Sequence, residues 1–214
     1  MAVFKAYDVR GIYPEELNEE LAYKVGRAFV KFVKVKEVVV GRDARISSDS
    51  LFEALTKGIT DEGANVINIG MVTTPMLYFG IANYGHESGI MITASHNPKQ
   101  FNGFKLCKAN AVPISGDTGI KDIQRTVEEN NFGEIRSKGG IVKKDVYADY
   151  EKHVLNFLPE SVKKGTGKQV KIVIDCSNGA SGPIIKQVFS KINCDATILF
   201  TEPDGNFPNH EANP

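Results

Sequence analysis

The amino-acid sequence predicts an α/β fold: a mixed, mainly parallel sheet with helices on both faces, followed by a second, incomplete α/β domain of similar plan. Short, continuously apolar segments of strand length alternate with longer segments whose apolar residues recur at helical spacing. The same order of strand, glycine-bearing turn, helix and strand occurs twice along the chain. Apolar strands separated by helices are typical of a parallel sheet that is covered on both faces.

The first part of the chain supplies the main sheet. Apolar residues at helical spacing predict a helix over residues 18–33, with Asn18 as its N-cap. Ser50 and Glu53 stand at capping-box spacing and predict the start of a second helix. Residues 104–114 are expected to form an extended excursion, followed by a helix around 120–127. Before this excursion, the expected order is strand 38–41, helix 51–59, strand 66–70, helix 74–83 and strand 89–93.

A polar segment with three glycines, residues 130–144, precedes the second unit. We therefore place a first domain at residues 1–144 and a second domain at residues 145–214. Residues 203–214 contain three prolines and are expected to form a loop. Because a domain should not end on a strand followed by a bare loop, we expect the second domain to be cut short. Its expected elements are helix 146–158, strand 170–174, helix 183–192 and strand 196–200.

The composition excludes several classes of protein. The chain has 214 residues, of which 42% are hydrophobic and 24% charged, and its 26 basic residues balance 26 acidic ones. A disordered chain would be less apolar and more strongly charged. A general binder of nucleic acid or of membrane surfaces usually carries a basic excess, so neither partner is expected. An ordinary globular protein remains, long enough to bury a core.

Charges and cysteines predict a cytoplasmic protein. The first twenty residues carry too many charges for the apolar core of a signal peptide. Residues 63–85 are uncharged, but polar residues and glycines interrupt them, which favours a strand, a turn and a short helix over a membrane span. Cys107, Cys176 and Cys194 have wide, unrelated spacings, so we interpret them as buried, reduced thiols.

Ser95 lies where the predicted strand 89–93 ends, in the segment Thr-Ala-Ser-His-Asn-Pro. In open parallel sheets ligands collect at the carboxyl ends of strands, and a hydroxyl on a loop stiffened by proline is well placed as a nucleophile. His96 adjoins it, and Asn102-Gly103 is expected to make a turn that returns the flexible cation Lys105 towards it. The alternative is a mere strand-ending turn, because Ser, Asn and Pro all favour turns.

Three other segments carry candidate binding residues. Arg10 could bind an anion bidentately, although a surface ion pair with Asp8 or a nearby glutamate explains it equally well. The segment Gly-Arg-Asp-Ala-Arg at residues 41–45 follows a strand end, and a solvated or interdomain ion-pair cluster is the favoured interpretation. Asp204-Gly205-Asn206 is interpreted as a plain turn.

Four of these segments together resemble one enzyme family. Thr-Ala-Ser-His-Asn-Pro followed by Asn-Gly-Phe-Lys resembles the phosphoserine loop of the α-D-phosphohexomutases, in particular the phosphomannomutase/phosphoglucomutase branch. Tyr-Asp-Val-Arg-Gly, Gly-Arg-Asp-x-Arg and Pro-Asp-Gly-x-Phe-Pro-x-His also resemble segments of that family, in the family's order. The resemblance covers essentially the whole chain.

The resemblance implies a reaction and a role for each residue. Ser95 would be phosphorylated and would transfer its phosphoryl group to a hexose phosphate of mannose or glucose, giving a 1,6-bisphosphate that returns its other phosphate. His96 and Lys105 would assist proton and charge movement, while Tyr7 and Arg10 would bind the substrate. The phosphate oxygen on Ser95 would coordinate Mg²⁺, the expected cofactor, which prefers oxygen ligands.

Two departures from the family pattern shape this expectation. The family takes most metal ligands from an Asp-Gly-Asp-x-Asp-Arg loop that this sequence lacks, and Ala212 stands where members often have proline. Members are also roughly twice as long, well above the size of a single core. We therefore expect an N-terminal portion with little or no mutase turnover alone, whose partners are hexose phosphates and the missing C-terminal domains.

Two rival functions follow from the same residues. The alternative to the mutase is a non-catalytic phosphosugar-binding or regulatory module derived from it, which the missing metal loop supports. A serine hydrolase using Ser95 and His96 is disfavoured, because the chain has no Gly-x-Ser-x-Gly elbow and an adjacent Ser-His pair lacks the geometry of a triad.

Overall fold

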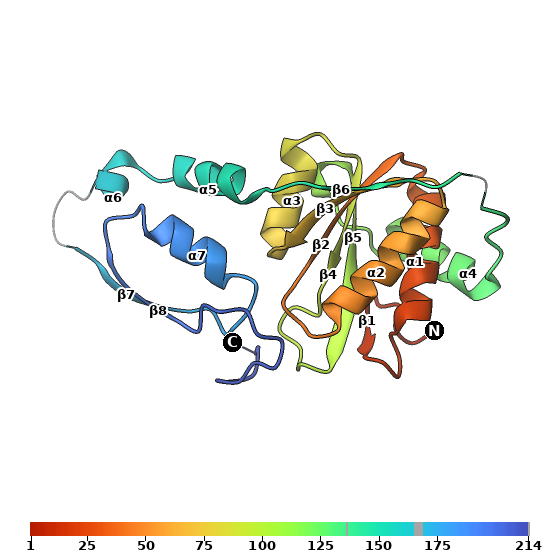
Figure 1. Cartoon of the computed structure of the whole chain (residues 1–214), viewed down its shortest axis with the longest axis horizontal. Coiled ribbons are helices and arrows are strands. Elements are labelled where there is room, and N and C mark those ends of the chain that lie inside the picture. Colours follow the sequence, from red (N-terminus) through yellow and green to blue (C-terminus); the bar gives the residue numbers. More distant parts are fainter. Residues whose placement is uncertain (136, 165–168, 214) are drawn as a thin grey trace.

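A six-stranded sheet forms the centre of the larger of two α/β units (Figure 1). The computed structural model describes residues 1–135, 137–164 and 169–213. Neighbouring strands of the large sheet follow the order β1 (Val9–Ile12), β5 (Phe101–Lys108), β4 (Ser88–Ile92), β2 (Glu37–Arg42), β3 (Asn65–Met71) and β6 (Ile141–Lys143).

Strand β5 runs against the other described strands of this sheet. It pairs antiparallel with β1 and β4, whereas β2 pairs in parallel with β3 and β4, and β3 with β6. The register sets Lys105 opposite Met91 and Phe104 opposite Ile92. Every residue of β4 is buried, as expected for an apolar strand covered on both faces.

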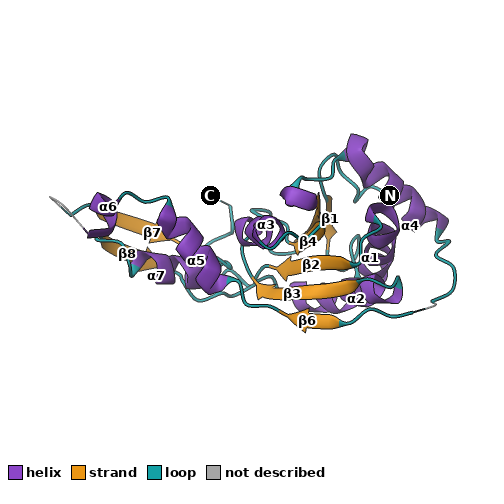
Figure 2. Cartoon of the chain, turned by 90° about the horizontal axis from the view of Figure 1, so that it is seen from above, coloured by secondary structure: helices purple, strands orange, loops and turns teal. Residues whose placement is uncertain are grey.

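Helices cover both faces of the large sheet (Figure 2). One apolar core lies beneath α1 (Glu19–Val33), α2 (Ser48–Asp61) and α4 (Lys121–Glu129), and the other lies beneath α3 (Thr74–Asn83). Short helical turns at η1 (Ala109–Ala111) and η2 (Gly116–Ile120) join β5 to α4. Helices α1 and α2 approach closely because Gly26 and Gly58 face the partner helix without side chains.

The second unit is built on two parallel strands, β7 (Lys171–Asp175) and β8 (Asp195–Leu199). Its helices are α5 (Tyr147–Asn156), α6 (Glu160–Lys164) and α7 (Gly182–Phe189), of which α7 connects the two strands. Ile184 and Val188 of α7 belong to the same apolar cluster as α3, and the Phe79 and Tyr150 rings meet edge to face at 5.5 Å. Helix α3 therefore provides one of the surfaces on which the second unit packs.

The predicted fold class is confirmed as an α/β domain with a mixed, mainly parallel sheet, followed by a small second α/β unit. Asn18 caps α1, since its side chain accepts a hydrogen bond from Leu21 N at 3.1 Å. The boundary at residues 144/145 stays a prediction. Residues 203–213 form neither helix nor strand, and Pro214 lies outside the described residues.

Two local predictions are wrong. Helix α2 begins at Ser48, before the predicted capping box, so Ser50 lies inside its first turn, where Ser50 Oγ donates to the Ser47 carbonyl. Asn102 and Gly103 do not form a turn but lie in β5, where Gly103 is so close to β1 that a Cβ would lie 2.3 Å from Val9 O. The chain reverses earlier, between residues 93 and 100.

Two of the three thiols are buried, as the sequence analysis expected, and the third is not. Cys107 and Cys176 are buried and free, and Cys194 is free and half-buried. Burial raises the pKa of Cys107 to about 11, so this thiol stays protonated near neutral pH. In the described part of the chain, each helix is too short or too polar to cross a membrane.

The close contact of α1 and α2 gives a stability prediction. Gly58→Ala should destabilise the fold by about 1–3 kcal/mol, because a Cβ at this position would lie 2.1 Å from Tyr23 O. Gly80→Ala in α3 is the matched control, since the nearest heavy atom to its Cβ would be 3.8 Å away. This control should be neutral or stabilising by up to about 1 kcal/mol. Urea unfolding of both variants measures the difference, and an equal effect would contradict the packing argument.

Candidate functional site

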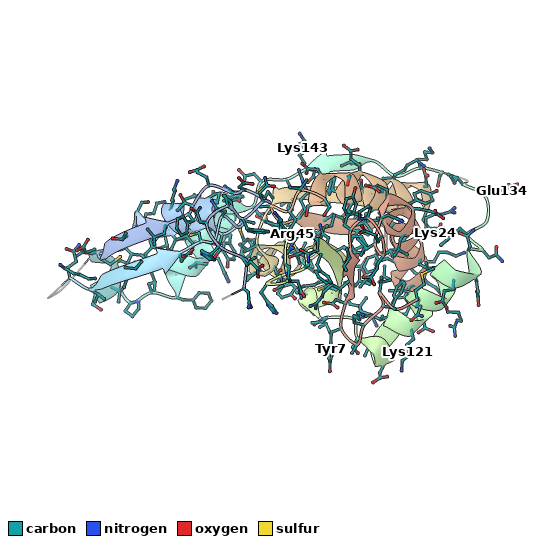
Figure 3. The ribbon with its side chains drawn as sticks, turned by 90° about the horizontal axis from the view of Figure 1, so that it is seen from below. Tyr7, Lys24, Arg45, Lys121, Glu134 and Lys143 are labelled. Atoms are coloured by element: carbon teal, nitrogen blue, oxygen red, sulfur yellow. The ribbon has the colours of Figure 1, made fainter. Side chains whose placement is uncertain are left out.

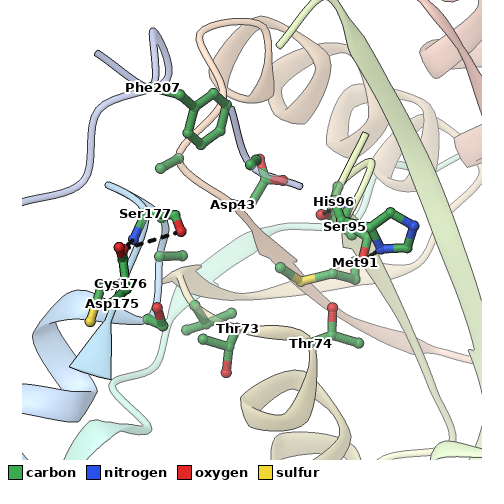
Figure 4. A pocket seen from close by; sticks show the side chains of 17 residues that line it. Asp43, Thr73, Thr74, Met91, Ser95, His96, Asp175, Cys176, Ser177 and Phe207 are labelled. Carbon is green, nitrogen blue, oxygen red and sulfur yellow. Dashed lines mark hydrogen bonds between the residues drawn. The ribbon is translucent and has the colours of Figure 1, made fainter. Parts of the chain in front are cut away.

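A cavity of about 470 Å³, here called the Ser95 cavity, opens between the two units (Figure 4). Its lining includes residues just beyond the ends of strands of both sheets: Asp43 directly after β2, and, a few residues after their strands, Thr73 after β3, Ser95 and His96 after β4, and Ser177 after β7. The carboxyl ends of parallel strands are where open α/β sheets place ligands. The second unit turns its own strand ends towards the same space, so both units enclose it.

Ser95 is exposed and lines this cavity from a tightly folded loop. Its φ of 58° is left-handed, which costs a non-glycine residue on the order of 1 kcal/mol. Ser95 N donates to Thr93 Oγ1 at 2.8 Å, and Asn97 N donates to Ala94 O at 3.1 Å. His96 Nδ1 lies 3.4 Å from Ser95 Oγ, so these neighbouring side chains do meet.

Asp43 and Arg45 lie beneath this loop. Asp43 accepts hydrogen bonds from Ser48 Oγ at 2.7 Å and from Arg45 Nε at 3.2 Å. The Arg45 side chain is buried and donates to backbone carbonyls of the Ser95 loop, whereas Arg42 pairs with Asp49 at the surface. The sequence favoured an ion-pair cluster for this segment, and the pairs are present. It did not predict the burial of Arg45 under the loop.

A second cavity, here called the Arg10 cavity, has a volume of about 420 Å³ and contains Tyr7, Arg10 and Asn97 in its lining. Tyr7 is 74% exposed and stands at the edge of the molecule (Figure 3). Arg10 pairs with the buried carboxylate of Asp8, as the ion-pair interpretation expected. Its Nε atom is buried and lacks a hydrogen-bond partner among the described residues, which is costly for a charged donor.

Lys105 lies on the strand next to β4 and close to the Arg10 cavity. It is half-buried on β5, directly opposite Met91, which lines the Ser95 cavity. Its Nζ lies 4.0 Å from Asp8 Oδ2, the carboxylate that also pairs with Arg10. The structure thus groups Ser95 with His96 and Tyr7 with Arg10. Lys105 is outside the lining of either cavity but contacts the charged group of the second.

The sequence analysis did not predict that residues of the second unit line the Ser95 cavity. Asp175 and Ser177 lie at the end of β7, opposite Ser95 and His96 across the cavity in Figure 4. Asp175 Oδ2 lies 3.1 Å from His210 Nε2, and His210 Nδ1 lies 2.7 Å from Glu211 O. The signal that could have found Asp175 is its position at the end of a predicted strand.

The described residues do not assemble a site for Mg²⁺. They contain no group of three or more His, Cys, Asp or Glu side chains that could hold a metal ion. The two carboxylates of the Ser95 cavity are engaged, Asp43 by Arg45 and Asp175 by His210 and Ser177 N. Ser95 offers one side-chain oxygen, which by itself does not make a metal site.

Comparison with known proteins gives consistent matches. Residues 1–134 match the family described as phosphoglucomutase/phosphomannomutase, alpha/beta/alpha domain I, and residues 147–214 match alpha/beta/alpha domain II. A phosphomannomutase of Escherichia coli is 41% identical over 100% of this chain and 48% of its own length. A phosphoglucomutase of Neisseria gonorrhoeae is 37% identical over 99% of this chain and 45% of its own length.

A solved structure agrees with these sequence matches. A phosphoglucomutase/phosphomannomutase family protein from Burkholderia thailandensis superposes with a TM-score of 0.84 and 35% identity, over 98% of this chain and 46% of that protein. The chain therefore spans about half the length of the curated relatives it matches.

The His210–Asp175 pair gives a titration prediction. Both ring nitrogens face oxygen acceptors, and the carbonyl of Glu211 followed by the Asp175 carboxylate raises the pKa of His210 above 6.5. Hydrogen bonding from Ser177 N, with His210 adding to it, lowers the pKa of Asp175 below 3.8. The pair is therefore intact below pH 6.5, is lost as pH rises through the raised pKa of His210, and is lost on the acid side as Asp175 protonates.

Proton NMR titration of the imidazole C–H signals measures this pKa. Asp175→Asn should move the pKa of His210 down towards its ordinary value, because it removes the negative charge. Asp149→Asn provides the matched control, since Asp149 accepts a hydrogen bond from Tyr84 Oη, and this variant should leave the His210 titration unchanged. An unchanged His210 titration in Asp175→Asn would contradict the pairing.

Proposed function

This chain belongs to the phosphoglucomutase/phosphomannomutase family, and from that premise we propose that its protein interconverts hexose 1-phosphate and hexose 6-phosphate through a phosphoserine at Ser95. One observation supports the proposal above all: exposed Ser95 lines the cavity between the two units, and His96 Nδ1 lies 3.4 Å from its hydroxyl oxygen. Because the chain spans about half the length of its relatives, the activity is proposed for the product of its complete reading frame.

The proposed reaction consists of two balanced phosphoryl transfers. In the first, the bond between phosphorus and Ser95 Oγ breaks, a bond from phosphorus to a free sugar hydroxyl forms, and the hydroxyl proton ends on Ser95 Oγ. The sugar 1,6-bisphosphate then reorients. The bond between its other phosphorus and the sugar oxygen breaks, a bond from that phosphorus to Ser95 Oγ forms, and the Ser95 proton ends on the sugar oxygen, which restores phosphoserine. Such transfers depend chiefly on positioning and on stabilising charge.

Each of the other proposed residues has a role that its surroundings support. His96 is within reach of Ser95 Oγ and would shuttle the proton. Lys105 and Arg10 flank the single carboxylate of Asp8, so this cluster keeps an excess positive charge for the sugar phosphate. Tyr7 stands exposed on the rim of the Arg10 cavity, where it would contact the sugar.

The cofactor and sugar remain proposals as well. Mg²⁺ is proposed on the family resemblance and on the chemistry of Ser95, whose phosphate oxygens would be the hard ligands that this cation prefers. The proposed substrates are phosphates of mannose or glucose, and the described residues do not discriminate between them.

The assignment of Ser95 is tested by intact-mass spectrometry after incubation with glucose 1,6-bisphosphate. The protein should gain one phosphoryl group, mapped to Ser95, and Ser95→Ala should gain none. Mutase turnover of this variant should fall by more than about 10³-fold, as when a covalent nucleophile is removed. Ser177→Ala is the control, since this serine lines the same cavity and also has a positive φ, of 50°.

Two other results would count against the mutase. Phosphoryl label retained by Ser95→Ala would refute the site. Binding of hexose phosphate by the complete protein without any phosphoryl transfer would favour the alternative, a non-catalytic phosphosugar-binding module.

Lys105 is tested separately from the nucleophile. Lys105→Met should slow phosphoryl transfer by about 10²–10⁴-fold, because it removes a cation and proton donor beside the transferring group. Lys108→Met is the matched control on the same strand. Its side chain points to the opposite face, where Nζ lies 5.0 Å from the Phe32 ring centre and donates to Thr118 O. Stopped-flow or quench measurement of Ser95 phosphorylation compares the two, and equal rates would remove Lys105 from the mechanism.

A further inference from the structure

Arg45 is a buried cation that the proposed reaction does not use. Its side chain is 1% exposed, yet all five of its guanidinium N–H groups have an acceptor. One acceptor is the Asp43 carboxylate, at 3.2 Å from Nε. The other four are backbone carbonyls of the loop after β4 and of the first residue of β5: Ser95 at 3.0 Å, Asn97 at 2.6 Å, Pro98 at 2.7 Å and Phe101 at 2.9 Å.

The shape of this network indicates what Arg45 does. A guanidinium is a rigid planar fork, so four carbonyls that bind it are fixed relative to one another. Burying a charge is costly unless it is paired and hydrogen-bonded, and a fold that needed only to fill this space would use an apolar side chain. The carbonyl of Ser95 itself is one of the four, so the guanidinium fixes the backbone of the proposed nucleophile directly.

Ser95 depends on such an external constraint. Its left-handed φ is unfavourable for serine and persists only where the surroundings impose it. Within the loop, Ser95 N, Asn97 N and Phe101 N donate to Thr93, Ala94 and Pro98. Arg45 binds the carbonyl side of the same backbone, so its fork and these bonds hold the loop from opposite sides.

Arg45 also contacts the second unit. The Phe207 ring lies with its centre 5.5 Å from the Arg45 guanidinium carbon. Gly205 lies so close to the backbone of residues 44–46 that a Cβ there would lie 2.5 Å from Ile46 N and 2.6 Å from Ala44 O. The loop of residues 203–208 is therefore seated against the segment that carries Arg45. Arg45 stands between this loop and Ser95.

We propose that Arg45 is a positioning residue that fixes the backbone of Ser95 for phosphoryl transfer and makes this geometry depend on the docking of residues 203–208. The catalytic part of this inference rests on the proposed function. Arg45 itself need not touch the substrate, because its donors are all occupied by the protein.

The first test measures hydrogen exchange of the protein from its complete reading frame, without substrate. Arg45→Lys keeps the charge but replaces five fixed donors by three rotating ones. We expect amides of residues 95–101 to exchange at least about tenfold faster in this variant, while α1 amides stay protected. Arg27→Lys is the matched control: Arg27 is also buried, pairs with Glu62, stacks on Phe132 and donates to the carbonyls of Phe132 and Gly133. It should leave residues 95–101 unchanged.

The second test measures transfer of a phosphoryl group from glucose 1,6-bisphosphate to Ser95. Arg45→Lys should lower the maximal rate by about 10–10²-fold, as expected for a reacting group misplaced by around 1 Å. The bisphosphate concentration at half-maximal rate should change little. In Arg45→Ala, added guanidinium should restore part of the rate, and methylammonium should not. Arg27→Lys should keep the full rate.

A variant in the second unit tests the coupling without altering Arg45. Phe207→Leu removes the stacked ring and should increase exchange at residues 95–101, by less than Arg45→Lys does. It also remains informative if Arg45→Ala does not fold. Unchanged exchange in Phe207→Leu would overturn the coupling.

The outcomes separate this inference from the proposed function. If the wild type takes no phosphoryl group at Ser95, the proposed function fails, and the exchange measurements still decide whether Arg45 holds the loop. If the wild type is phosphorylated normally and Arg45→Lys matches it in rate and exchange, the inference fails while the function stands. Faster exchange with an unchanged rate would limit Arg45 to a structural role and overturn its positioning role.

Discussion

The reversal of the chain between β4 and β5 is the constraint on which the site depends. The two strands are neighbours and antiparallel, so the short segment of residues 93–100 must reverse the chain between the end of β4 and the start of β5. A tight turn beside a buried strand leaves backbone carbonyls facing the interior, and buried carbonyls need donors. The Arg45 guanidinium supplies them, and Asp43 partly balances its charge. The carbonyl of Ser95 thus faces the buried guanidinium, while the residue itself is exposed to solvent.

The same reversal explains why positive charge gathers around Asp8 although the chain has no net charge. Strand β5 returns between β1 and β4, which brings Lys105 beside the segment that carries Asp8 and Arg10. Two cations then share one buried carboxylate, and the buried Arg10 Nε has no partner among the described residues. A local excess of positive charge next to a cavity attracts anions without a basic surface. The neutral composition therefore excludes a broad nucleic-acid footprint but is compatible with a phosphate site.

The second unit forms one wall of the Ser95 cavity and contacts the segment that carries Arg45. Because β7 ends towards the large sheet, Asp175 and Ser177 face the Ser95 cavity from the opposite side (Figure 4). His210, in the loop that follows β8, pairs with Asp175 at the end of β7. Gly205 and Phe207 of the same loop lie against residues 44–46. These contacts join two elements that are far apart in the sequence, so the geometry of the cavity depends on both units.

The sequence by itself determined the features that depend on local periodicity and on short motifs. These are the α/β class, the start of α1 at Asn18, and the position of Ser95 directly after a buried strand. Only the tertiary structure decided which strands pair: that β5 is antiparallel, that β6 joins the large sheet, and that Asn102 lies within a strand. It also decided that Arg45 is buried beneath the Ser95 loop. The physical reason is that a side chain's burial and partners are set by whichever distant segment packs over it, and the neighbouring sequence carries no record of that segment.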